Sequence, residues 1–184
     1  ILLPYHEELK KAGACFGATS GYERPMWYSL NGKDPKYNYS YNFQNWYPSV
    51  KYETINTRKN LGLFDLSSFA KFDLQGDSVH NELQKICTAN VKSVPGKITY
   101  TQMLNEDGGI ETDLSITCIE KNNFRIVSSA ATREHDKAHI QKYLSDKVKL
   151  TDVTEDHCCF GLFGPRSREM MTKLSSDEFS KEKF

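Results

Sequence analysis

The segment from residue 110 to 118 carries the residues that most suggest chemistry. Apolar side chains fall at positions 110, 114, 116 and 118, and Asp113, Ser115 and Thr117 alternate with them. At the two-residue period of a strand, the apolar set faces a core and the polar set faces water or a polar pocket. Aspartate disfavours strands, so Asp113 needs a local reason. Either Asp113 has a functional role, or it lies at the surface, for example in a salt bridge to Lys or Arg on the next strand. The strand pattern alone favours the surface position.

Two other groups could hold a metal ion. His135 and His139 are four residues apart on a predicted helix, but a metal needs more than two ligands and Asp136 points about 100° away. We therefore favour a solvated, charged helix face there. His157, Cys158 and Cys159 adjoin a short strand, where adjacent side chains point to opposite faces, so core packing is favoured over a metal site or a nucleophile. The sequence predicts no metal.

Several common cofactor and catalytic motifs are absent. The chain contains no G-x-G-x-x-G, G-x-x-x-x-G-K-[ST], G-x-S-x-G or H-E-x-x-H sequence. With 24 basic and 24 acidic residues the formal charge is zero, which argues against nucleic-acid binding by bulk charge. No apolar run approaches the ~18 residues that would span a membrane. Five irregularly spaced cysteines favour a reducing compartment over a disulfide framework.

The 184 residues are enough for one domain, or for one domain and part of another. No signal peptide is expected, and without an initial Met the chain reads as a piece of a longer protein. Helices are predicted at 5–12, 50–60 (capped by Ser49), 77–86 (capped by Asp77), 133–145 and after 167. Strands are predicted at 15–18, 63–67, 71–74, 98–104, 110–119, 124–128, 148–153 and 159–163.

The intermixed order predicts an α+β fold with helices packed on antiparallel sheets. Residues 105–109 form a five-residue loop that fits a hairpin between two of the strands. The run from Tyr37 to Phe43 alternates aromatic and polar residues. It is either a strand or an extended connector pinned to a surface by its rings. A domain boundary is expected between residues 35 and 48.

Several ordered motifs resemble the folate-binding fold of the glycine-cleavage T-protein (aminomethyltransferase) family. Residues 62–72 (GLFDLSSFAKF) look like its opening segment. Residues 100–114 (YTQMLNEDGGIETDL) resemble its tyrosine-bearing strand, its Asn-Glu-x-Gly-Gly turn and its Asp-bearing strand. Residues 124–130 and 162–167 fit its next two landmarks. The resemblance covers residues 48–184.

Residues before position 48 indicate which branch of this family the chain resembles. Residues 4–9 (PYHEEL) and 21–28 (GYERPMWY) look like the junction in dimethylglycine dehydrogenase and sarcosine dehydrogenase flavoproteins. The resemblance implies that residues 1–45 are the tail of a flavoprotein central domain with a connector. Residues 46–184 would be the N-terminal part of the folate-binding domain, truncated at its C-terminal end. FAD is then expected only on an upstream part of the full-length protein.

The resemblance also implies a reaction and a site. A flavin oxidises a methylated amine of the dimethylglycine or sarcosine type, and tetrahydrofolate captures the one-carbon unit as 5,10-methylenetetrahydrofolate. Asp113 matches the essential Asp, as proton acceptor or electrostatic stabiliser. Tyr100 matches a tyrosine that lines the pterin pocket. Ser115 and Ser129 match folate-lining positions, and Phe69 takes the place of a Met as an apolar wall.

Departures from the family pattern keep alternatives open. Thr112 replaces the first of two tandem acids, and a further acid of the site would lie beyond Phe184, so the fragment alone is expected to be inactive. One alternative is a non-catalytic module like the regulatory subunit of pyruvate dehydrogenase phosphatase, which shares this architecture. Another is an aminomethyltransferase or demethylase with a different methylated substrate. The expected compartment is the mitochondrial matrix in a eukaryote or the cytoplasm in a bacterium, with no nucleic-acid or membrane partner.

Overall fold

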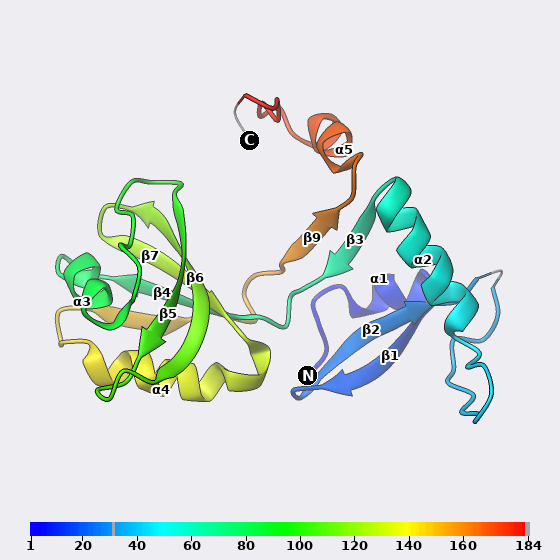
Figure 1. The fold of residues 1–184 in the computed structure, drawn as a ribbon, viewed down its shortest axis with the longest axis horizontal. Helices are drawn as coiled ribbons and strands as arrows, with labels where there is room; N and C mark the ends of the chain where they lie inside the picture. The colour runs from blue at the N-terminus through cyan, green and yellow to red at the C-terminus, as the bar shows by residue number, and fades with distance from the viewer. Residues whose placement is uncertain (31, 183–184) are drawn as a thin grey trace. The chain divides into compact units, whose positions relative to one another are not determined.

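The computed structural model describes residues 1–30 and 32–182. The chain divides into two compact units, which are Ser68–His157 and the two segments Ile1–Ser67 and Cys158–Phe184 taken together. In Figure 1 the continuous unit runs from green to orange-yellow, and the discontinuous unit combines the blue and red ends of the chain. No helix within the described ranges is long and apolar enough to cross a membrane.

A five-stranded sheet organises the unit Ser68–His157. Its strands run in the order β5-β6-β7-β4-β8, and every pairing is antiparallel. The strands are β4 (Ala70–Gln75), β5 (Ile98–Leu104), β6 (Ile110–Glu120), β7 (Asn123–Ser128) and β8 (Lys149–Asp152). Helices α3 (Val79–Ile86) and α4 (Arg133–Tyr143) complete the unit with a 3-10 turn, η1 (Ala130–Thr132). This mixture of helices and antiparallel sheet confirms the predicted fold class.

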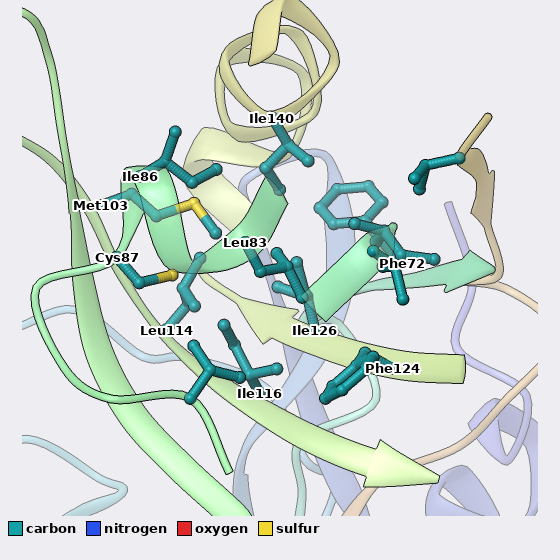
Figure 2. Close-up of a cluster of buried hydrophobic side chains, with 14 of the residues drawn as sticks. Phe72, Leu83, Ile86, Cys87, Met103, Leu114, Ile116, Phe124, Ile126 and Ile140 are labelled. Atoms are coloured by element: carbon teal, nitrogen blue, oxygen red, sulfur yellow. The ribbon is translucent and has the colours of Figure 1, made fainter. Parts of the chain in front are cut away.

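One face of this sheet forms the hydrophobic core. Alternate residues of β4, β6 and β7 are buried on this face, and both helices add apolar side chains to them. Figure 2 shows Leu83 and Ile86 of α3 and Ile140 of α4 pointing toward Phe72, Ile116 and Ile126 of the strands. Burial of each such side chain stabilises the fold by about 1.5–3 kcal/mol.

The opposite face of the sheet is polar, as the alternation in β6 predicts. Register places Tyr100, Ser115, Val127 and Lys71 side by side across β5, β6, β7 and β4. Asp113 follows one pair further along β6, opposite Gln102. The expectation for Ile110 is wrong, because this residue is 70% exposed. It begins β6 at a register shift beside Met103 and Leu104, where the alternation of the strand is interrupted.

The loop from residue 105 to 109 forms the predicted hairpin turn. The side-chain oxygen of Asn105 accepts hydrogen bonds from the backbone N–H groups of Asp107 (3.1 Å) and Gly109 (2.8 Å). Gly108 has a φ of +80°, a conformation that glycine adopts without steric cost. The turn fixes the register that aligns Tyr100 with Ser115.

The discontinuous unit contains two small sheets and three helices. Strands β1 (Ala14–Thr19) and β2 (Tyr22–Tyr28) form a hairpin, and β3 (Gly62–Asp65) pairs antiparallel with β9 (Phe160–Phe163). The helices are α1 (His6–Lys11), α2 (Tyr47–Lys59) and α5 (Ser167–Leu174). Figure 1 shows β3 and β9 side by side although they lie far apart in the sequence.

Two predicted helix starts need correction, and one of the two alternatives for residues 37–43 is wrong. Helix α2 begins at Tyr47 with Pro48 in its first turn, so Ser49 lies inside it, because proline fits the first helical turn. Helix α3 is preceded by Ser78, while the Asp77 carboxylate accepts a hydrogen bond from Asn122. Residues 37–43 form no strand.

Most of the aromatic rings in residues 37–43 do not hold this segment against the protein surface. Tyr37 packs edge-on to Trp27, at 6.1 Å between ring centroids. Tyr39, Tyr41 and Phe43 are almost fully exposed.

Candidate functional site

An open hollow of about 310 Å³ lies on the polar face of the five-stranded sheet. Phe69, Tyr100, Asp113, Ser115 and Ser129 all line it, so the structure brings the five predicted site residues together. Each comes from a different point of the sheet, just before β4, on β5, twice on β6, and just after β7. Their roles in binding or catalysis remain predictions.

Tyr100 and Asp113 form the polar centre of this hollow. They are diagonal neighbours on β5 and β6, within reach of long side chains, and the Tyr100 hydroxyl donates a hydrogen bond to Oδ2 of Asp113. The bond to the carboxylate, aided by the negative charge, raises the pKa of Tyr100. Oδ1 of Asp113 has no protein partner among the described residues, so it remains available to a ligand.

The salt bridge that would make Asp113 an ordinary surface residue does not form. No residue in the described part of the chain makes an ion pair with Asp113. The arginine on the same polar face, Arg125 of β7, instead pairs with Asp73 of β4 through two bonds of 2.7 and 2.8 Å. The observed partner of Asp113 is a phenol, which leaves the carboxylate charge uncompensated.

The walls of the hollow are apolar on one side and hydroxyl-bearing on the other. Phe69 exposes 37% of its surface and offers a flat aromatic face. Ser115 lies beside Tyr100 in the register. The Ser129 hydroxyl accepts a hydrogen bond from the backbone N–H of Ala131 at 3.2 Å, which caps η1. Ser129 therefore has a structural role in addition to its place in the hollow.

Ser128 lines the hollow and was not predicted. It is 3% exposed, and its hydroxyl has no hydrogen-bond partner among the residues described. Buried polar groups are normally paired, so this buried hydroxyl is an exception. The alternation of β7 assigns Ser128 to the core side with Phe124 and Ile126. The sequence pattern therefore did not indicate that Ser128 lines the hollow.

One histidine of α4, His135, takes part in a polar network. His135 contacts Glu111 of β6 at 3.0 Å and Asp136 at 3.2 Å. The expected solvated face is wrong for Asp136, which is fully buried and accepts a hydrogen bond from Thr132. Within the described residues no three metal-ligating side chains gather. Cys158 is exposed and Cys159 half-buried, so the expected core packing is wrong for Cys158.

A comparison with protein families matches residues 5–184 to the GCVT N-terminal domain. The chain belongs to the GCVT N-terminal domain family. Membership confirms the resemblance to the T-protein and makes this an aminomethyltransferase-type domain. The hollow with Tyr100 and Asp113 is therefore the candidate site of a GCVT-type domain.

Two curated relatives show the context in which this GCVT domain occurs. The chain is 36% identical over 180 residues to "4-methylaminobutanoate oxidase (formaldehyde-forming)" of Paenarthrobacter nicotinovorans, with 97% of the chain and 22% of that protein covered. It is 27% identical over 221 residues to mitochondrial sarcosine dehydrogenase of Homo sapiens, with 98% and 24% covered. The chain thus spans about a quarter of the length of these relatives.

A solved structure supports the same assignment. Aminomethyltransferase T of the glycine cleavage system from Bartonella henselae superimposes with a TM-score of 0.77 at 25% identity. The match covers 94% of this chain and 43% of that protein. The GCVT fold of the chain is therefore that of the aminomethyltransferase T-protein.

Proposed function

We propose that this chain is the folate-binding, one-carbon-transfer part of a flavin-dependent enzyme that demethylates an amine of the sarcosine or dimethylglycine type. The observation that carries the proposal is the hydrogen-bonded pair of Tyr100 and Asp113 in the hollow of the GCVT domain. Amine oxidation is proposed for the remainder of such a protein, because the chain covers only about a quarter of its two relatives.

The residues of the hollow fit a tetrahydrofolate headgroup. A pterin is flat and presents several N–H donors. Phe69 offers an aromatic ring, and Oδ1 of Asp113 is an acceptor without a protein partner among the described residues. When bound, tetrahydrofolate supplies the nitrogens that take up a one-carbon unit to give 5,10-methylenetetrahydrofolate.

Asp113 can serve in two ways at this site. Its carboxylate can accept a proton released during transfer, and it can stabilise positive charge on the incoming one-carbon unit. Tyr100 holds Oδ2 through its hydroxyl and thereby restricts the orientation of the carboxylate. Because no described cation pairs with Asp113, its negative charge is available to the reacting groups.

A calorimetric titration with tetrahydrofolate under reducing conditions tests the proposal. We expect the parent chain to bind and Asp113→Asn to bind at least tenfold more weakly, a loss of about 1.4 kcal/mol. Asp107→Asn, at the exposed tip of the hairpin loop, is the matched control and should bind like the parent.

Equal binding by the parent and Asp113→Asn would contradict a binding role for this carboxylate. Absence of binding by the parent would mean either a regulatory module or a pocket that needs further residues. The same titration on the longer protein would then separate a regulatory module from a pocket that further residues complete.

A further inference from the structure

The hollow of the folate site lies where two neighbouring strands lose their backbone pairing. The ladder between β6 and β7 ends at the pair of Ser115 and Val127. Two residues beyond this pair come Asp113 on β6 and Ser129 after β7, and both line the hollow. In the described part of the chain no backbone pairing joins β6 to the residues after β7. The spacing of these two walls of the hollow therefore depends on other contacts.

A side-chain bridge connects the two walls. Glu111 lies on β6 two residues before Asp113, and the period of the strand places both side chains on the same face. His135 lies on α4, which follows Ser129 through the 3-10 turn η1. The Nε2 atom of His135 lies 3.0 Å from Oε2 of Glu111, and its Nδ1 atom lies 3.2 Å from Oδ1 of Asp136.

Both ring nitrogens of His135 thus face a carboxylate oxygen. A neutral imidazole has one N–H donor and one acceptor nitrogen, whereas the imidazolium ion has two donors. Only the imidazolium ion can therefore donate to both carboxylates at once. The bond to Asp136 is the largest cause that raises the pKa of His135, and the bond to Glu111 adds to it against the effect of burial. The folded chain therefore favours the charged ring.

The surroundings decide which contact is lost when His135 is deprotonated. Asp136 is fully buried, and its Oδ2 accepts a hydrogen bond of 2.9 Å from the Thr132 hydroxyl. Leaving its buried Oδ1 unpaired would be unfavourable. Glu111 is more exposed and keeps a hydrogen bond of 2.8 Å from Nδ2 of Asn105. The single N–H of a neutral ring therefore stays with Asp136, and the contact with β6 is lost.

Few other charged groups surround this bridge. His139, one turn further along α4, stacks beside His135 at 6.4 Å between ring centroids. Lys142 and Glu106, beyond it, pair with each other at 3.0 Å. Within the described residues His135 makes ion pairs with the two bridged carboxylates alone. These two acids are therefore the groups that respond most directly to the charge of the ring.

We propose that His135 is a positioning residue of the folate site, which in its protonated form holds the wall carrying Ser129 against the wall carrying Asp113. The inference rests on the proposed folate function for its effect on binding. Below the folded pKa of His135 the bridge is formed and the two walls are tied together. As pH rises through that value the contact with Glu111 is lost, so tetrahydrofolate binds more weakly.

Calorimetric titrations with tetrahydrofolate at pH 5.5 and pH 8.5, under reducing conditions, measure the effect. We expect the parent chain to bind about fivefold more weakly at pH 8.5. His135→Gln and Glu111→Gln each remove one side of the bridge and should bind almost equally at the two pH values. His80→Gln is the matched control, because this histidine contacts the carbonyl oxygen of Val91 and no carboxylate. It should keep the pH dependence of the parent.

A second measurement follows the wall without a ligand. The backbone N–H of Ala131 donates to the Ser129 hydroxyl at 3.2 Å, so its 15N-amide NMR signal reports on this wall. In the parent the Ala131 signal should change with the same midpoint pH as the His135 ring, and in His135→Gln it should not.

Three results would contradict the proposal. They are an Ala131 signal that does not follow His135, a parent affinity that is the same at both pH values, and a pH dependence of binding that persists in His135→Gln. If no variant binds tetrahydrofolate at either pH, the proposed folate function fails. The Ala131 signal then decides by itself whether His135 holds the wall.

Discussion

The largest cause of the raised pKa of Tyr100 is a neighbouring carboxylate. The hydrogen bond to Asp113 comes first among its causes, and the Gln102 side chain acts in the opposite direction. Asp113→Asn removes the negative charge, so we expect the Tyr100 pKa to fall toward its ordinary value near 10. The measurement is a pH titration of the 13Cζ tyrosine signals, with Tyr100→Phe to assign the signal among the ten tyrosines.

Asp107→Asn also removes one negative charge, but not next to Tyr100. This control variant should leave the Tyr100 pKa unchanged. An unchanged Tyr100 pKa in Asp113→Asn would mean that the hydroxyl and the carboxylate are not paired in solution. The pair would then give Asp113 no fixed orientation, and the positioning role of Tyr100 would be lost.

Glu82 is a buried carboxylate that links α3 to the segment after α4. It accepts hydrogen bonds from the Ser78 hydroxyl (2.6 Å), the Ser145 hydroxyl (2.7 Å) and the Ser145 backbone N–H (2.8 Å). Burial acts to raise its pKa, but these bonds together hold the pKa below its usual range. Glu82→Gln should lower the free energy of unfolding by about 2 kcal/mol at pH 7, measured by urea denaturation.

The pH dependence of this effect has a defined sign. Because the folded-state pKa of Glu82 is depressed, its contribution is present above its unfolded pKa near 4.3 and is lost as pH falls through the folded value. The gap between parent and Glu82→Gln should therefore narrow below pH 4. Glu134→Gln, exposed on α4, serves as control, and an equal loss there would deny Glu82 a special role.

The individual residues of the candidate site could be predicted from the sequence to different degrees. Asp113 stands out because a carboxylate in mid-strand breaks the usual preference, and the period of β6 places it on the polar face. Tyr100 emerges only from family resemblance, since an aromatic residue on a strand is ordinary. Ser128 could not be found, because its place in the hollow depends on where β7 ends and not on alternation.

At the scale of elements, His135 joins α4 to the start of β6. Its hydrogen bond to Asp136 and the contact with Glu111 raise its pKa above the ordinary value near 6.5. The contribution of the pair to stability is therefore fully present below about pH 6.5 and is lost as pH rises through the folded pKa. His135→Gln should cost less than about 1 kcal/mol, since the imidazole is half-exposed.

Denaturant unfolding at pH 5.5 and pH 8.5 measures this effect. We expect the difference between parent and His135→Gln to be larger at pH 5.5. Glu111→Gln should reproduce part of the pH dependence, because it removes one of the two acids. A difference that grows with pH would contradict the assignment of a raised pKa.

Elements with strong alternation or clear turn chemistry were predicted well. The hairpin of β5 and β6 follows from two-residue periodicity and from the Asn105–Gly109 turn, and both are local. The start of α2 was missed because Pro48 can open a helix as readily as Ser49 can cap one. For the aromatic run from residue 37 the sequence left a strand and a connector open, because alternation alone does not show whether a partner strand exists. The folate-binding role of the hollow and the expected domain boundary stay predictions.

At the scale of the whole molecule, the unit Ser68–His157 contains an entire hydrophobic core. Every residue of the core cluster, from Ala70 to Val148, belongs to this one continuous segment. We expect residues 68–157 expressed alone to fold cooperatively, with an unfolding enthalpy of about 60 kcal/mol. Differential scanning calorimetry measures this enthalpy.

Leu83→Ala provides the matched destabilised form of this segment. Leu83 is fully buried in the cluster, and its truncation should lower stability by about 2–5 kcal/mol. A broad transition without a heat-absorption peak in residues 68–157 would show that the core needs the rest of the chain.

The pairing of β3 with β9 has a consequence for synthesis on the ribosome. Phe160 follows Asp65 by 95 positions, so β3 emerges about 5–20 s before its partner strand at ordinary elongation rates. The continuous segment between them is complete before β9 exists. Meanwhile the backbone edge of β3 and the side chains of Leu63 and Phe64 lack their partner strand. If the ribosome stalls in this interval, the nascent chain exposes an unpaired, apolar strand, which is a binding site for chaperones.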